Sequence, residues 1–158
     1  MTFAPPEAVR WAGDGAAVEI LDQTRLPEDE VYLRLESAAD VAAAIRALRV
    51  RGAPAIGIAA AMGAALEAAR HAHLPPDALR ARLDEACALL LRTRPTAVNL
   101  AWALERIRRR ADELRGRPGP ELAAGLRAEA NAILEDDRAR CRRIAEHGLE
   151  LLPEHGEV

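Results

Sequence analysis

The residues best suited to chemistry are two arginines that each precede a predicted helix. In the string Arg51-Gly52-Ala53-Pro54, the small residues Gly52 and Ala53 leave the backbone open to a ligand. Pro54 suits a first helical turn, because the N–H group it lacks would have no partner there. The free N–H groups of such a turn attract anions. Arg94 precedes another predicted helix, the fourth along the chain. Both guanidinium groups could therefore bind one phosphate, each through a bidentate contact.

A purely structural role is the alternative for both arginines. They could pair with nearby carboxylates or donate to carbonyl groups at helix ends, and the residue types alone leave both explanations open.

Other reactive side chains favour structural interpretations. His71 and His73 lie two residues apart in a link next to two prolines, and two histidines without a Cys or carboxylate ligand rarely form a catalytic metal site, so we expect surface residues rather than metal ligands. Cys87 and Cys141 fall in helical patterns with core-like spacing and without a CxxC motif. We therefore expect two core thiols, and neither a disulfide, a zinc site nor a nucleophile.

Composition and charge exclude several classes of function. All 22 basic residues of the 158-residue chain are arginines, so chemistry that needs a lysine, such as a Schiff base, is excluded within it. The formal net charge of −3 gives no overall positive field that would attract nucleic acid or a membrane surface. We interpret the three arginines at 108–110 as a solvent-exposed helix face rather than a nucleic-acid contact. The longest uncharged stretch, 53–66, is too short to span a bilayer. We expect a soluble, cytoplasmic protein without a secretion signal.

The elements that must position the two arginines follow from hydrophobic periodicity. Residues 9–11 and 18–21 flank a glycine-rich turn and predict a β-hairpin, and the alternation in 31–36 predicts a third strand. From residue 37 the period changes to 3.6. The sequence therefore predicts an α+β fold, with a small antiparallel sheet of about three strands in 1–36 and a bundle of about five helices in 37–152.

The five predicted helices have recognisable starts and apolar stripes. Ser37 and Asp40 predict a capped start for the first helix, which should end near Val50 with Leu48 in its apolar stripe. The second begins at Pro54 and contains small residues that permit close packing. The third begins near 75–77, the fourth is capped by Thr96, and the fifth runs from Glu121 to about Leu152 with an apolar stripe of Leu122, Leu126, Ile133, Cys141 and Ile144.

Three strings, in this order and spacing, identify a family resemblance. They are LDQTRLP (21–27), AIRALRVRGAPAIGIAAAMG (44–63) and LRTRPTAVNLAWAL (91–104). The chain resembles the N-terminal half of the methylthioribose-1-phosphate isomerases over nearly its whole length. Ribose-1,5-bisphosphate isomerases and the regulatory subunits of the translation initiation factor 2 exchange factor are related. The third string, with Asn99, favours the methylthioribose enzymes over both.

The resemblance implies an aldose–ketose isomerase of methionine salvage and methionine biosynthesis. Members convert 5-methylthioribose 1-phosphate to 5-methylthioribulose 1-phosphate without a metal or nucleotide cofactor. The residues of this chain that match the family's substrate-binding positions are Arg51, Gly52, Ala53 and Arg94. They are the residues for which the helix starts independently suggest an anion site.

The resemblance also implies that the chemical groups lie elsewhere. In the family the catalytic Cys and Asp belong to a second, Rossmann-like domain that follows the part seen here, and Cys141 does not match the catalytic motif. We therefore expect this chain alone to be inactive, with no catalytic residue of its own. We expect the complete protein to form a homodimer. Alternatives are a non-catalytic regulatory or interaction module, a ribose-1,5-bisphosphate isomerase, and an enzyme whose second half is a separate chain.

Overall fold

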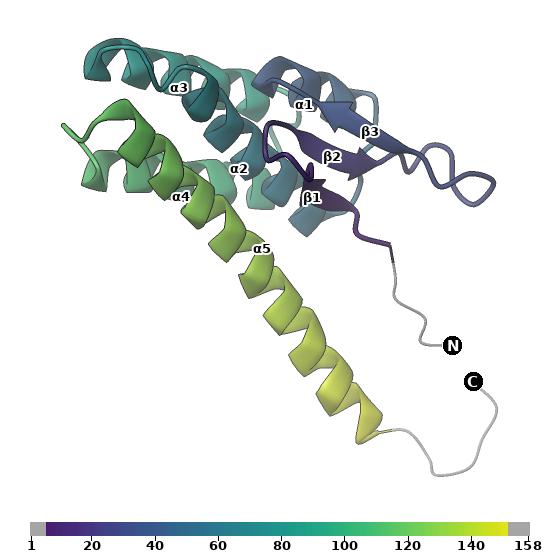
Figure 1. Cartoon of the computed structure of the whole chain (residues 1–158). Coiled ribbons are helices and arrows are strands. Elements are labelled where there is room, and N and C mark those ends of the chain that lie inside the picture. The colour runs from purple at the N-terminus through teal and green to yellow at the C-terminus, as the bar shows by residue number, and fades with distance from the viewer. Residues whose placement is uncertain (1–5, 152–158) are drawn as a thin grey trace.

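A three-stranded sheet followed by five helices forms the part of the chain that the structure describes, residues 6–151, which confirms the α+β expectation (Figure 1). The coordinates are a computed structural model. The strands are β1 (Val9–Trp11), β2 (Val18–Leu21) and β3 (Tyr32–Leu35), and the helices are α1 (Ala38–Arg46), α2 (Ala53–Arg70), α3 (Pro76–Leu91), α4 (Val98–Glu113) and α5 (Gly119–Leu149).

The sheet has the order β1-β2-β3, and both pairs of strands are antiparallel. In the register, Val9 lies opposite Ile20 and Val18 lies opposite Leu35. All four side chains are buried in the same core as the helices. The sheet therefore shares one hydrophobic core with the helices and is not a separate unit.

Helix α2 is the centre of the molecule. Its residues 56–66 are all buried, and the other four helices pack around it. Small residues make this possible. A Cβ atom at Gly57 would lie 2.8 Å from the backbone oxygen of Asn99 on α4, and one at Gly63 would lie 3.2 Å from Val41 on α1. The expected close packing of this helix is confirmed.

Helix α1 ends earlier than its apolar stripe predicts. The last helical residue is Arg46, and Leu48 is exposed with a φ of 58°. The N–H of Leu48 donates to Ile45 O, and the N–H of Arg49 donates to Ala44 O. These two bonds form a Schellman motif, which usually has glycine where Leu48 stands. The prediction of a helix to Val50 was wrong because the usual glycine signal is missing.

Helix α4 begins two residues after the predicted cap. Its N-cap residue is Ala97, and no side chain caps the helix. Thr96 is exposed and lies in a turn closed by a bond from Ala97 N–H to Arg94 O (2.9 Å). The prediction that Thr96 caps this helix was wrong, because the backbone turn takes up the position that a capping side chain needs.

Helix α5 has a packed first half and an exposed second half. It begins at Gly119 rather than Glu121, and its predicted end at Leu152 lies outside the described residues. Leu122, Leu126 and Ile133 are buried as expected, but Cys141 and Ile144 are exposed. The second half extends beyond the other helices, so they do not cover its stripe (Figure 1). The expectation of a core position is therefore wrong for Cys141, whereas Cys87 is buried.

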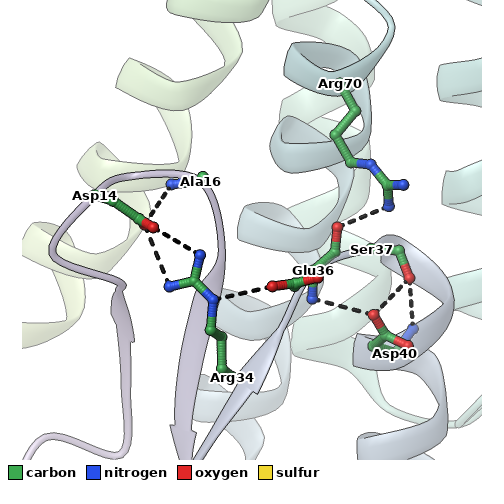
Figure 2. A network of polar contacts seen from close by, with 7 residues as sticks. All are labelled: Asp14, Ala16, Arg34, Glu36, Ser37, Asp40 and Arg70. Carbon is green, nitrogen blue, oxygen red and sulfur yellow. Dashed lines mark hydrogen bonds and ion pairs between the residues drawn. The ribbon is translucent and has the colours of Figure 1, made fainter.

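A polar network joins the sheet to the start of α1 (Figure 2). Arg34 on β3 donates to Asp14 (2.7 Å) and to Glu36 (3.1 Å). The Ser37 hydroxyl accepts from Asp40 N–H (3.1 Å), which confirms the predicted cap of the first helix. The charged side chains of this network therefore have hydrogen-bond partners within the chain.

Candidate functional site

The four predicted site residues line one pocket. Arg51, Gly52, Ala53 and Arg94 come from two loops that are far apart in sequence, and the pocket they share has a volume of about 570 Å³. The loops meet because α2 and α4 pack closely near their starts, where Gly57 contacts Asn99. The other lining residues are Leu48, Ile56, Thr96, Ala97, Val98 and Asn99.

The start of α2 leaves backbone donors without side-chain acceptors. Gly52 is the N-cap residue and has a φ of 96°, a backbone conformation that residues other than glycine rarely adopt. It makes no side-chain capping bond, and Pro54 has no N–H to satisfy. The N–H of Ala53 therefore lies at the pocket with no intrahelical partner, as expected for a first-turn donor.

The start of α4 is built in the same way. Arg94 lies three residues before the N-cap residue, and no side chain caps the helix. Neither α2 nor α4 has an acidic residue in its first turn, whereas the first turns of α1, α3 and α5 contain Asp40, Asp77 and Glu121. A carboxylate there would compete with an incoming anion. No acidic side chain of the first turn therefore neutralises the positive end of either helix at the pocket.

The two arginines differ in what holds their side chains. Within residues 6–151, neither Arg51 nor Arg94 forms an ion pair with a carboxylate. Arg51 Nε donates to Leu48 O (3.0 Å), so part of its side chain bonds a carbonyl at the end of α1. That bond leaves the Nη groups of Arg51 for another acceptor. Among the described residues, neither arginine pairs with a carboxylate as a structural role could require, whereas Arg51 Nε does bond a carbonyl group.

Sequence reasoning missed the apolar side of this pocket. Leu48 is 44% exposed and Val98 is 79% exposed, and both lie beside the arginines. The left-handed turn that directs Leu48 outward has no sequence signal, since leucine takes the place of glycine. Val98 is the first residue of a helix and lies just outside the stripe that the periodicity reveals. The pocket therefore combines cationic groups with an apolar wall.

Other candidate residues lie away from this pocket. His71 is half-buried and contacts Glu67 (2.9 Å), while His73 is exposed. In the described part of the chain, no three His, Cys, Asp or Glu side chains gather as a metal site would require. Burial raises the pKa of Cys87 to about 11, so its thiol stays protonated at neutral pH. Within the same residues, none of the helices has the length and apolar character needed to cross a membrane.

Comparisons with known proteins agree with the resemblance carried by the three strings. Curated methylthioribose-1-phosphate isomerases from Trichlorobacter lovleyi and Desulforudis audaxviator are each 47% identical to this chain, over 95% and 98% of it. The crystal structure of 5-methylthioribose 1-phosphate isomerase from Pyrococcus horikoshii has a TM-score of 0.89 and 35% identity over 95% of the chain. That of translation initiation factor eIF-2B, subunit delta, from A. fulgidus has a TM-score of 0.83 and 36% identity over 92%.

The chain spans only part of these relatives, covering 43% of the two curated isomerases and 42% and 41% of the two solved chains. The Initiation factor 2 subunit family matches residues 49–158, which include both helix starts that line the pocket. The chain belongs to the Initiation factor 2 subunit family.

Proposed function

We propose that this chain is the substrate-phosphate-binding part of an isomerase that converts 5-methylthioribose 1-phosphate to 5-methylthioribulose 1-phosphate. The observation that carries the proposal is that Arg51 and Arg94 line one pocket at two helix starts without acidic residues. The names of the curated relatives supply the substrate.

The pocket suits a sugar phosphate that also carries an apolar group. Two guanidinium groups and the N–H of Ala53 can bind phosphoryl oxygens, with charge-assisted hydrogen bonds. Leu48 and Val98 offer an apolar surface to the methylthio end of such a substrate. Together these groups bind and orient the substrate, and they hold the phosphorylated carbon in place while the ring opens.

The pocket does not contain groups for the proton transfers of the isomerisation. Its lining residues include no His, Cys, Asp or Glu. Moving a proton between neighbouring carbons needs a positioned acid or base. We propose that a Cys and an Asp in a second, Rossmann-like domain of the complete protein do this chemistry, and that the complete protein is a cytoplasmic homodimer that needs no cofactor.

A regulatory module is the second candidate. The eIF-2B subunit delta of A. fulgidus is as similar in sequence to this chain as the Pyrococcus isomerase is, at 36% against 35% identity. The exposed second half of α5, with Ile144 and Leu149 on its surface, would then serve as an interface.

An assay of two proteins tests the proposal. The complete gene product and the 158-residue chain are each given 5-methylthioribose 1-phosphate, and the ketose product is measured over time. We expect turnover by the complete protein and none by the 158-residue chain, which should still bind the substrate in calorimetry. Turnover by the 158-residue chain alone would contradict the proposal that the groups for proton transfer lie in a second domain. A complete protein that self-associates but neither binds nor converts the sugar phosphate would instead support the regulatory module.

A further inference from the structure

One of the three strings, LDQTRLP, has no residue in the pocket, yet its residues contact the loop that carries Arg51. Gln23 lies two residues after the end of β2. Its backbone N–H donates to Arg49 O (3.0 Å), and its side-chain Nε2 donates to Arg51 O (3.3 Å). Gln23 therefore bonds two carbonyls, two residues apart, in the loop between α1 and α2.

Asp22 anchors this contact to the protein interior. It is 5% exposed and is the one buried charged residue in the described part of the chain. Its carboxylate accepts hydrogen bonds from the Thr24 hydroxyl (2.6 Å) and the Thr24 N–H (3.1 Å). The other carboxylate oxygen lies 3.7 Å from Arg49 Nε. The turn after β2 is thus held internally by Thr24 and tied to the loop through Arg49.

The loop between α1 and α2 contains two residues with a left-handed backbone, so contacts from its surroundings help to hold its conformation. Leu48 and Gly52 both have positive φ values, 58° and 96°. A non-glycine residue in the left-handed region costs on the order of 1 kcal/mol and persists only where its surroundings impose it. Arg51 lies between these two residues. Its side chain donates to Leu48 O, and its carbonyl accepts from Gln23.

We propose that Gln23 is a positioning residue for the anion site: it fixes the Arg51 carbonyl, and so directs the Arg51 side chain and the N–H of Ala53 toward the pocket. Neither Gln23 nor Asp22 lines the pocket, so each acts only through the loop. This inference rests on the proposed phosphate-binding role of Arg51.

Sulfate is a suitable probe, because its charge does not change between pH 4 and pH 8. Binding to the 158-residue chain is measured by calorimetry for wild type, Gln23→Ala, Arg51→Ala and the double variant. Loss of one hydrogen bond predicts about a two- to tenfold weaker affinity for Gln23→Ala. Gln23→Ala should have a smaller effect once Arg51 is alanine, because only the N–H of Ala53 then depends on the position of the loop. Glu28→Gln, in the same exposed link, is the control and should keep wild-type affinity or slightly exceed it.

The variant Gln23→Glu keeps the shape of the side chain and removes its donor. We expect weak sulfate binding at pH 7 and recovery as the pH falls toward the ordinary glutamic acid pKa of about 4.3, where the protonated acid can again donate to Arg51 O. Recovery at low pH in Gln23→Glu, together with weak binding at every pH in Gln23→Ala, would assign the effect to the donor at residue 23 rather than to the charge of the glutamate.

The outcomes separate this inference from the proposal on which it rests. If wild type does not bind sulfate, the anion site itself is refuted. If wild type binds and Arg51→Ala loses binding, but Gln23→Ala and Gln23→Glu keep it at pH 7, the positioning role of Gln23 is refuted. An equal loss for Gln23→Ala with and without Arg51 would also refute it, because the effect would not pass through Arg51.

Discussion

Arginines at two regions of the surface differ in the partners that the chain provides. At the pocket, Arg51 and Arg94 have no carboxylate partner within residues 6–151, and both are exposed. At the edge of the sheet, the side chain of Arg34 is 41% exposed, yet it pairs with Asp14 and Glu36 (Figure 2). Residue type and exposure are alike, so they do not identify a binding arginine. Arg51 and Arg94 differ from Arg34 in lining one shared pocket at two helix starts and in having no carboxylate partner within residues 6–151.

The helix starts in the two regions differ in the same way. At the network, the first turn of α1 is capped by Ser37 and contains Asp40, so its positive end is already neutralised. At the pocket, α2 and α4 begin without a capping side chain or an acidic residue. The chain's own side chains thus neutralise the start of α1, whereas the first turns of α2 and α4 contain no acidic side chain.

The largest expected effect comes from removing an arginine of the pocket. In the complete protein, Arg94→Ala should weaken binding of 5-methylthioribose 1-phosphate by about 1.5–3 kcal/mol, the contribution of a hydrogen bond to a charged group. Arg34→Ala removes the same charge from a similarly exposed position and should leave substrate binding unchanged. The Michaelis and rate constants of both variants measure the difference.

If Arg94→Ala left both constants at their wild-type values, Arg94 would not belong to the site. If Arg34→Ala weakened binding as much as Arg94→Ala, the effect would be one of overall charge, and the distinction between the two regions would be lost.

A smaller effect should follow from moving the two helix starts apart. In Gly57→Ala, the new Cβ would lie 2.8 Å from Asn99 O, a backbone atom that cannot rotate away. Overpacking of this kind costs about 1–3 kcal/mol, reduced by the higher helix propensity of alanine. We expect a lower free energy of unfolding in urea and weaker phosphate binding, because the start of α4 must shift.

The matched control is Gly63→Ala, further along the same helix. There the nearest atoms belong to the Val41 side chain at 3.2 Å, which can adjust more easily than a backbone carbonyl. It should destabilise less and leave phosphate binding unchanged. Equal phosphate affinity in Gly57→Ala and wild type would show that the spacing of α2 and α4 does not matter to the pocket.

Local patterns were sufficient for most of the fold. A glycine-rich turn predicted the first two strands, alternation predicted the third, and helix starts together with helical periodicity predicted the five helices. The patterns failed where neighbouring elements decide the outcome. Cys141 and Ile144 continue the stripe of α5 but lie beyond the helices it packs on. Leu48 continues the stripe of α1 but occupies a left-handed turn.

For the site, the sequence indicated which residues carry the charge but not how they are arranged. Arg51 and Arg94 were predicted from their places before helices, and the structure brings them to one pocket. Nothing local could show that they lack carboxylate partners, since that depends on the fold. The same holds for Gln23, whose contact with Arg51 spans 28 residues and two elements. Long-range pairing is the information that periodicity does not contain.

The smallest effect should appear in the pH dependence of stability, and it compares a buried acid near the pocket with an exposed acid of the network. Burial alone would raise the pKa of Asp22, but hydrogen bonds from Thr24 and the charges of Arg49 and Arg25 hold it below the ordinary value of 3.8. The pKa of Asp14 is also lowered, by its bonds with Arg34 and Ala16. A lowered pKa in the folded state stabilises the protein above pH 3.8, and this stabilisation is lost as the pH falls through the lower, folded value.

We therefore expect the free energy of unfolding to fall less steeply below pH 4 in Asp22→Asn and in Asp14→Asn than in wild type. Urea unfolding between pH 2.5 and pH 6, at low salt and in 0.5 M NaCl, measures both slopes. Salt should shrink the difference made by Asp14, whose partner is an exposed arginine, more than the difference made by Asp22, which depends on buried hydrogen bonds. A wild-type slope in Asp22→Asn would mean that this carboxylate titrates alike in the folded and unfolded chain. The raising effect of burial would then cancel the lowering effects of Thr24, Arg49 and Arg25 on the pKa of Asp22.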